Sequence, residues 1–201
     1  KEYLPRVFDS ILQKHLSSSG AVLVKGCKWC GKTMTSSRAS NSILYMQDAD
    51  NSASYLALAD TQPSLLLKGD TPRLIDEWQM APVLWDAVRF AVDQRQAVGQ
   101  FILTGSSVPK DGVTAHTGTG RISQLLMRPM SLFESKESNG AISLKSLFEG
   151  GLDISATSSL TIQDLAFAIC RGGWPASVTM AKEFALNTSV NYIEAIINED
   201  I

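Results

Sequence analysis

A lysine and a hydroxyl group follow a glycine-bearing segment at residues 26–33, which read GCKWCGKT. Their spacing is G-x-x-x-x-G-K-[ST]. In this pattern backbone N–H groups surround phosphate oxygens, the lysine reaches the β- and γ-phosphates, and the hydroxyl binds Mg²⁺. Gly31 has no side chain that would block an approaching phosphate. The segment therefore predicts a site for ATP with Mg²⁺, whose binding residues are Gly26, Cys27, Lys28, Trp29, Cys30, Gly31, Lys32, Thr33 and Met34.

The same eight residues contain C-x-x-C, a pattern found in redox pairs and zinc sites. A structural zinc site needs four ligands, but Cys170, His15 and His116 are scattered along the chain. Because both cysteines occupy variable positions of a complete phosphate loop, we interpret Cys27 and Cys30 as small loop side chains. One hypothesis stays open, namely that their oxidation to a strained bridge distorts the phosphate cradle.

Two acids follow an apolar run in RLIDE, residues 73–77. Ligands bind at the carboxyl ends of the strands in an open α/β sheet, so a strand here would present Asp76 and Glu77 to the nucleotide. We expect Asp76 to hold Mg²⁺, usually through water, and Glu77 to polarise the attacking water as a general base. The alternative is a pair of solvated acids at a strand end.

Polar residues also end the next apolar run, QFILTGSS. Thr104 and Ser106 are candidates for sensing the γ-phosphate or orienting water, against the alternative of a plain strand-to-loop turn. Arg121 follows a segment rich in glycine and threonine and is a candidate arginine finger, although the residues alone favour a surface arginine.

The surrounding pattern alternates apolar runs with amphipathic helices, which is typical of a doubly wound α/β sheet. A first helix is expected to start near Pro5 and to end before Gly20, with further helices from Lys32, at 52–60 and at 82–94. Strands are expected at 21–25, 42–48, 73–77, 100–107 and within 121–132. From Leu144 onward the pattern becomes helical, which predicts a small helical segment after the sheet.

The composition excludes several classes of protein to which the chain could otherwise belong. The chain has 201 residues, 44% hydrophobic and 19% charged, with a net charge of −2 and three cysteines. These values argue against a globally basic nucleic-acid binder and a disulfide scaffold. There is no signal-peptide layout and no apolar run that approaches the ~20 residues of a membrane span, so we expect a cytoplasmic protein without a membrane partner. The start at Lys1 and the helical pattern up to Ile201 suggest a piece of a longer chain.

The ordered set of motifs resembles one family. It is the predicted AAA+-superfamily ATPases of bacteria and archaea that carry an uncharacterised C-terminal domain. The resemblance covers nearly the whole chain, and LIDEWQ, followed by an apolar helix and FILTGS, is its most specific part. The motifs that carry it are YLPR, GCKWCGKT, LYMQDAD, RLIDEWQMAPVLWDAVRFAVD, FILTGSS, GTGRI, MRPMSLFE, RGGWPASV and YIEAIINEDI.

The resemblance implies a three-layer P-loop NTPase sandwich with a parallel sheet at residues 1–143. It also implies a helical segment at 144–201 that leads to a largely absent C-terminal domain. Arg121 matches the family's Gly-Arg pair and is implied to contact a γ-phosphate, in its own site or a neighbour's. Arg6 matches an arginine near the family's start, for which the resemblance assigns no role.

The resemblance implies the same roles for the other site residues. Lys32 and Thr33 bind phosphate and Mg²⁺, Asp76 and Glu77 serve hydrolysis, and a sensor is supplied by Thr104 or Ser106. The chain departs from the family at residues 27–29, where Pro-Arg-Gln-type residues are usual, and a bulky tryptophan with two thiols alters nucleotide access. The segment after Gly112 also looks degenerate.

We therefore expect Mg²⁺-dependent ATP hydrolysis by an AAA+-like P-loop ATPase. The alternative is a nucleotide-gated binding module with little or no turnover, which engages DNA or a protein partner through the missing domain. A small-molecule phosphotransferase is disfavoured because no Arg-rich lid segment is visible. A homo-oligomer remains an open expectation.

Overall fold

The computed structural model describes residues 3–105, 117–150 and 155–199. The chain forms two compact units. One, the sheet unit, runs from Arg6 to Arg128, and the other, the helical unit, contains the described residues from Pro129 onward together with residues 3–5. The sequence-based boundary between residues 143 and 144 stays a prediction about domains, while the compact units divide earlier in the chain.

The sheet unit is built on five parallel strands in the order β2-β3-β4-β1-β5. This confirms the predicted α/β fold with a parallel sheet. Strand β4 lies in the middle, so the strand before the glycine loop and the strand that ends in Asp76 are each its direct neighbours. The strands are β1 (Ala21–Lys25), β2 (Ser42–Tyr45), β3 (Arg73–Asp76), β4 (Phe101–Gly105) and β5 (Ile122–Leu126).

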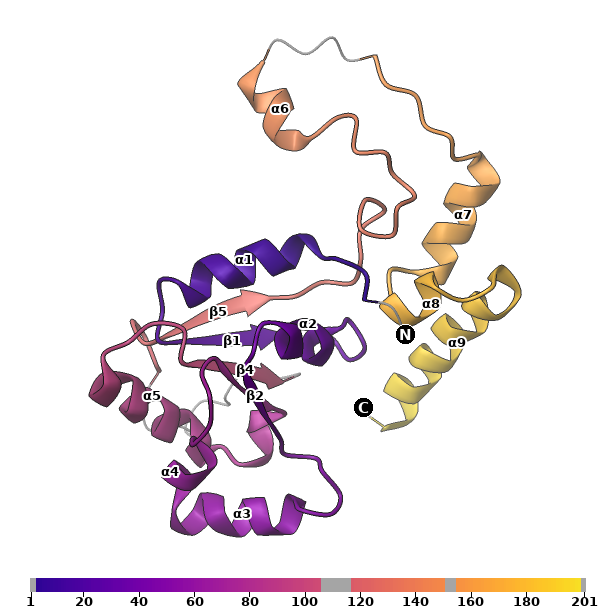
Figure 1. Ribbon diagram of the computed structural model, residues 1–201. Helices are drawn as coiled ribbons and strands as arrows, with labels where there is room; N and C mark the ends of the chain where they lie inside the picture. Colours follow the sequence, from indigo (N-terminus) through magenta and orange to yellow (C-terminus); the bar gives the residue numbers. More distant parts are fainter. Residues whose placement is uncertain (1–2, 106–116, 151–154, 200–201) are drawn as a thin grey trace. The chain divides into compact units, whose positions relative to one another are not determined.

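Helices cover both faces of this sheet, as Figure 1 shows for α1 on one side and α3 to α5 on the other. The second side is a continuous apolar cluster, in which Trp78 and Trp85 pack with their ring centroids 5.2 Å apart. A short 3₁₀-helix, η1, lies just after β3. The helices of this unit are α1 (Val7–Leu16), α2 (Lys32–Arg38), α3 (Ser52–Thr61), α4 (Pro63–Leu66), η1 (Trp78–Met80) and α5 (Val83–Arg95).

Strand β1 shows why this sequence forms a central strand. All of its first four side chains are fully buried. Because side chains alternate between the two faces of a strand, Ala21 and Leu23 join the cluster with α3 to α5, and Val22 and Val24 face the other layer. A strand buried on both faces reads as a continuous apolar run, which is why residues 21–25 were predicted with the correct bounds.

The register brings the candidate residues to one edge of the sheet. Lys25, the last residue of β1, pairs with Gly105 of β4, and Asp76 of β3 pairs with Thr104 of β4. The carboxyl ends of β1, β3 and β4 therefore coincide. The glycine loop leaves β1 at this edge and enters α2 at Lys32.

The helical unit contains the predicted helical segment. In it, α7 and α8 each pack against α9, and the rings of Trp174 and Tyr192 lie 4.4 Å apart. The Arg171 guanidinium donates two hydrogen bonds of 2.8 Å to the Glu137 carboxylate. The helices are α6 (Leu144–Glu149), α7 (Ile162–Arg171), α8 (Pro175–Val178) and α9 (Lys182–Glu199).

We find no helix that combines the length and the apolar character needed to cross a bilayer in the described parts of the chain.

Candidate functional site

The glycine loop, residues 26–31, connects β1 to α2 by a tight path. A Cβ atom on Gly26 would collide with the carbonyl oxygen of Met127, so only glycine fits there. Gly31 has φ 103°, a left-handed conformation that glycine adopts at little cost. Between them, the N–H of Cys30 lies 3.4 Å from the carbonyl oxygen of Cys27, which closes a turn with Trp29 at φ 64°.

The start of α2 supplies donors to this loop. The first four N–H groups of an α-helix have no partner within the helix. Here they belong to Gly31, Lys32, Thr33 and Met34, because the first intrahelical bond runs from the N–H of Thr35 to the carbonyl oxygen of Gly31 at 3.0 Å. The Lys32 N–H is directed at the Cys30 sulfur, and the N–H groups of Gly31, Thr33 and Met34 lie at the same helix start.

Lys32 is held inside the loop. Its side chain is buried, with 6% of the residue exposed, and its Nζ donates to the carbonyl oxygens of Gly26 at 2.9 Å and Cys27 at 3.0 Å. Burial of an ammonium group is costly unless the charge is hydrogen-bonded. The two loop carbonyls meet that need and keep the charge next to the loop amides.

Three oxygen-bearing side chains converge where β3, β4 and α2 meet. The hydroxyls of Thr33 and Thr104 both donate to Oδ1 of Asp76, at 2.8 Å and 2.5 Å. Carboxylate and hydroxyl oxygens are the hard ligands that Mg²⁺ prefers. The Thr33 hydroxyl and the Asp76 carboxylate therefore fit a magnesium ion at the mouth of the loop.

Glu77 follows β3 directly and has a left-handed backbone, with φ 56° and ψ 47°. Such a conformation is uncommon for a residue with a side chain and is concentrated at functional sites. The Glu77 carboxylate accepts a hydrogen bond from the side-chain amide of Gln79. The turn directs Glu77 into the cavity that the loop also lines.

This cavity has a volume of about 620 Å³, within the range of about 300–1,000 Å³ that is usual for small-molecule sites. Charged, polar and aromatic groups line it together. They come from the loop, α2 and the carboxyl ends of β2 and β3. The lining residues are Lys28, Trp29, Gly31, Lys32, Thr33, Met34, Ser37, Tyr45, Gln47, Glu77 and Gln79.

Most of the predicted site residues are thus brought together. Asp76 and Thr104 are linked to the cavity through Thr33. Of the loop cysteines, Cys27 is exposed and Cys30 is buried. Ser106 lies outside the described residues, so its predicted sensor role has no structural account here.

Arg121 lies elsewhere. It precedes β5, and its carbonyl oxygen accepts from the N–H of Ala21, at the start of β1. Its guanidinium binds Asp93 of α5 at 2.8 Å. The loop leaves the far end of β1, roughly 13 Å away at about 3.3 Å per residue. Arg121 therefore does not reach the loop of its own chain.

Several cavity residues were not predicted from the sequence. Tyr45 and Gln47 follow the carboxyl end of β2, and Gln79 lies in η1. A signal for the first two was present, because all strands of a parallel sheet present their carboxyl ends to the same edge. Gln79 ends the LIDEWQ motif, but its place in the cavity could not be predicted because it depends on the turn at Glu77.

The two loop thiols differ in environment. Burial raises the pKa of the Cys30 thiol, the charge of Lys32 opposes this increase, and the neighbouring Cys27 side chain adds to it. In the described residues, no group of three or more His, Cys, Asp or Glu side chains is placed to hold a metal ion. Within that part of the chain, the structure contains no zinc site built on these cysteines.

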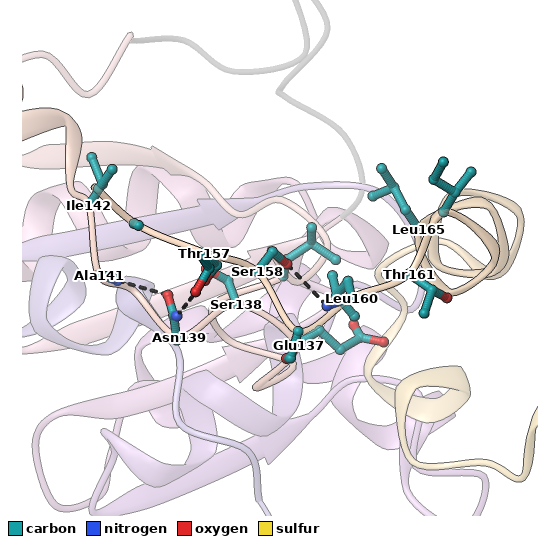
Figure 2. A pocket seen from close by; sticks show the side chains of 14 residues that line it. Glu137, Ser138, Asn139, Ala141, Ile142, Thr157, Ser158, Leu160, Thr161 and Leu165 are labelled. Atoms are coloured by element: carbon teal, nitrogen blue, oxygen red, sulfur yellow. Dashed lines mark hydrogen bonds between the residues drawn. The ribbon is translucent and has the colours of Figure 1, made fainter. Parts of the chain in front are cut away.

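A second cavity, of about 420 Å³, lies in the helical unit. Figure 2 shows its wall of hydroxyl, amide and apolar side chains, with Asn139 bonded to the main chain at Ala141 and Thr157. Its one carboxylate, Glu137, is bound by Arg171. The described lining therefore has no group free for acid–base chemistry, and the first cavity is the better candidate.

Residues 18–136 match the family model described as AAA domain, which covers more than half of the chain. The chain belongs to the AAA domain family. Membership indicates a nucleotide-binding domain of the P-loop ATPase type, and the match spans all five strands of the sheet and the loop of this AAA domain. A search of the curated proteins found no match.

Proposed function

We propose that this AAA domain binds ATP with Mg²⁺ and hydrolyses it. The observation that carries the proposal is the contact between Thr33, in the first turn of α2, and Asp76, at the end of β3. Thr33 lines one cavity together with Lys32 and Glu77. Two sequence motifs separated by more than 40 residues meet here in the arrangement that phosphate and metal binding require.

Each group has a defined task in this proposal. The amides of Gly31 to Met34 and the Lys32 ammonium bind the β- and γ-phosphates. When bound to Thr33 and Asp76, Mg²⁺ neutralises phosphate charge. Glu77 orients a water molecule toward the γ-phosphorus and accepts its proton.

A thermal-shift experiment tests the binding step. At a Mg-ATP concentration of 100 times Kd, binding stabilises the folded state by about 2.7 kcal/mol, which corresponds to about 5–11 °C in Tm for a chain of this size. We expect this shift in wild type and not in Lys32→Met. Lys14→Met, on the exposed side of α1, is the matched control and should keep it. No shift with any nucleoside triphosphate would remove the proposal.

One observation favours a second function, that of a nucleotide-gated binding module. The Glu77 carboxylate accepts a hydrogen bond from Gln79, and this contact fixes the direction of the carboxylate, which can keep it away from an attacking water. If the contact persists with nucleotide bound, the domain binds ATP but turns over slowly until a partner releases Glu77. The proposed partner is DNA or protein, engaged through a C-terminal domain.

Phosphate release separates the two functions. An active hydrolase releases phosphate steadily, and Glu77→Gln abolishes release while Mg-ATP still raises Tm. For the gated module, wild-type release is negligible, and Gln79→Ala increases it several-fold. A Gln79→Ala variant that binds Mg-ATP but stays inactive would argue against a held general base.

Arg121 enters this proposal only through another copy of the chain. Arg121 lies at the amino edge of the sheet and binds Asp93. It can therefore act as an arginine finger only by contacting the γ-phosphate bound to a neighbouring copy. Such a contact requires a homo-oligomer, and mass measurement with and without Mg-ATP tests for one.

A further inference from the structure

Arg6 is a buried cation that binds main-chain atoms of the glycine loop. It directly precedes α1 and is 7% exposed. Its guanidinium donates to the carbonyl oxygen of Cys30 at 2.9 Å and to that of Arg128 at 2.8 Å. The start of α1, the glycine loop and the segment after β5 are therefore joined by one side chain.

The backbone of Arg6 is itself fixed. Its N–H donates to Oδ2 of Asp9 at 2.9 Å, and its carbonyl oxygen accepts from the N–H of Asp9 at 3.1 Å. The side chain consequently extends from a rigid point at the helix start. A buried guanidinium needs its hydrogen bonds to offset the lost hydration. Breaking the contacts to the loop would therefore destabilise the folded chain.

The contact with Cys30 determines the direction of a loop amide. The carbonyl of Cys30 and the N–H of Gly31 belong to the same planar trans peptide, in which the two groups point in opposite directions. A donor that holds the oxygen on one side turns the N–H to the other side. Gly31 lines the cavity, while the described lining residues do not include Arg6.

The loop is thus held by two cations. Lys32 binds the carbonyls of Gly26 and Cys27 at the beginning of the loop, and Arg6 binds the carbonyl of Cys30 at its end. Lys32 itself is part of the cavity wall, so it is available to the phosphates. Arg6 acts on the loop from outside the cavity.

We propose that Arg6 is a positioning residue for the phosphate loop, which fixes the Cys30–Gly31 peptide so that the Gly31 N–H is presented to a bound phosphate. This rests on the proposed function, in which the loop binds the phosphates of ATP. Without Arg6, the peptide is free to rotate and one amide–phosphate hydrogen bond is lost. Hydrogen bonds to charged groups correspond to about a 10- to 100-fold change in affinity.

The experiment measures Mg-ATP affinity by calorimetry in wild type, Arg6→Met and Arg6→Lys. Arg6→Met should bind about 10- to 100-fold more weakly. Arg6→Lys, whose ammonium reaches one carbonyl but not both in the same geometry, should fall between them. The matched control is Arg95→Met, an exposed arginine in the last turn of α5, stacked on Phe101 at the start of β4, and it should bind as wild type does.

A spectroscopic readout separates positioning from general stability. With ¹⁵N-glycine labelling, the Gly31 amide resonance of wild type should move on addition of Mg-ATP, and in Arg6→Met this movement should be lost or much smaller. If Arg6→Met does not fold, Arg6→Lys carries the test. A variant that melts earlier but keeps wild-type affinity and the wild-type Gly31 response would overturn the positioning role. Wild-type protein that binds no nucleotide would instead overturn the proposed function, and this inference with it.

Discussion

Thr104→Val removes one hydroxyl from the centre of the site and leaves the side-chain shape almost unchanged. Thr104 is fully buried, and its Oγ1 donates to Oδ1 of Asp76 at 2.5 Å. In the variant, Asp76 keeps its hydrogen bond from Thr33. The substitution therefore isolates the link between the middle strand of the sheet and the acid at the end of its neighbour.

The expected cost follows from the type of hydrogen bond. A hydrogen bond to a charged group contributes about 1.5–3 kcal/mol to stability, and the near-identical shape of valine keeps the cavity contribution small. We expect Thr104→Val to lower the free energy of unfolding by that amount. For an m-value of about 2 kcal/mol/M in urea, the midpoint moves down by roughly 1 M.

Urea titration followed by tryptophan fluorescence measures this cost, because Trp78 and Trp85 are buried in the sheet unit. The same substitution is then made in an Asp76→Asn background. Here the hydroxyl meets a neutral amide oxygen, and a neutral hydrogen bond contributes only about 0.5–1.5 kcal/mol. The reasoning that a charge-assisted bond joins the two residues would be refuted by either of two results. One is a decrease in the free energy of unfolding of less than about 0.5 kcal/mol in the wild-type background. The other is an equal decrease in both backgrounds.

Three further predictions concern other parts of the chain. The Arg171 guanidinium holds the pKa of Glu137 below its ordinary value of 4.5, so this pair stabilises the helical unit above that pH and its contribution disappears as the pH falls through the lowered pKa. Thermal scans from pH 7 to pH 3 should therefore show a steeper loss for wild type than for Glu137→Gln, and equal slopes would contradict the assignment. Oxidation by a low-molecular-weight disulfide, in which the two thiols lose two protons and two electrons, should join Cys27 to Cys30 and reduce the Tm shift with Mg-ATP because it distorts the loop. Dithiothreitol should restore the shift and Cys27→Ser should abolish the sensitivity; an oxidised protein with an undiminished shift would show that the bridge leaves the loop intact. Finally, Arg121→Ala should change the free energy of unfolding by less than about 1 kcal/mol, as is usual for exposed ion pairs. It should also leave the Mg-ATP affinity of the monomer unaltered. A tenfold weaker affinity in dilute protein would contradict the placement of Arg121 at the far edge of the sheet.

The fold was predictable because its central strands β1, β3 and β4 are almost completely buried and the helices α1 and α5 are amphipathic. Strand β1 appears with the expected bounds, and α1 lies within the expected stretch between Pro5 and Gly20. Strands β2 and β3 are shorter than expected, since β2 ends at Tyr45 and β3 ends at Asp76, directly before the left-handed Glu77. The 3₁₀-helix after it was missed, because tertiary packing of Trp78, and not a local pattern, places this turn.

The core of the site was predictable because its motifs lie directly after apolar runs. Lys32, Thr33 and Asp76 could be placed at one edge from the rule that parallel strands end together. Arg121 could not be placed by its motif, since a Gly-Arg pair does not say whether the arginine stands at the beginning or the end of a strand. Arg6 was matched by the family resemblance, but its role could not be predicted, because its partners are main-chain carbonyls 24 and 122 residues away in the chain.

The middle position of β4 has a mechanical consequence. One of its neighbours continues into the nucleotide loop, and the other ends in the acid that its own threonine binds. Sliding β4 by a single residue, about 3.3 Å, would break that bond and shear the pairing with both neighbours together. A force that pulls on the chain after Gly105 would therefore displace the phosphate loop and the acidic residues of the site together.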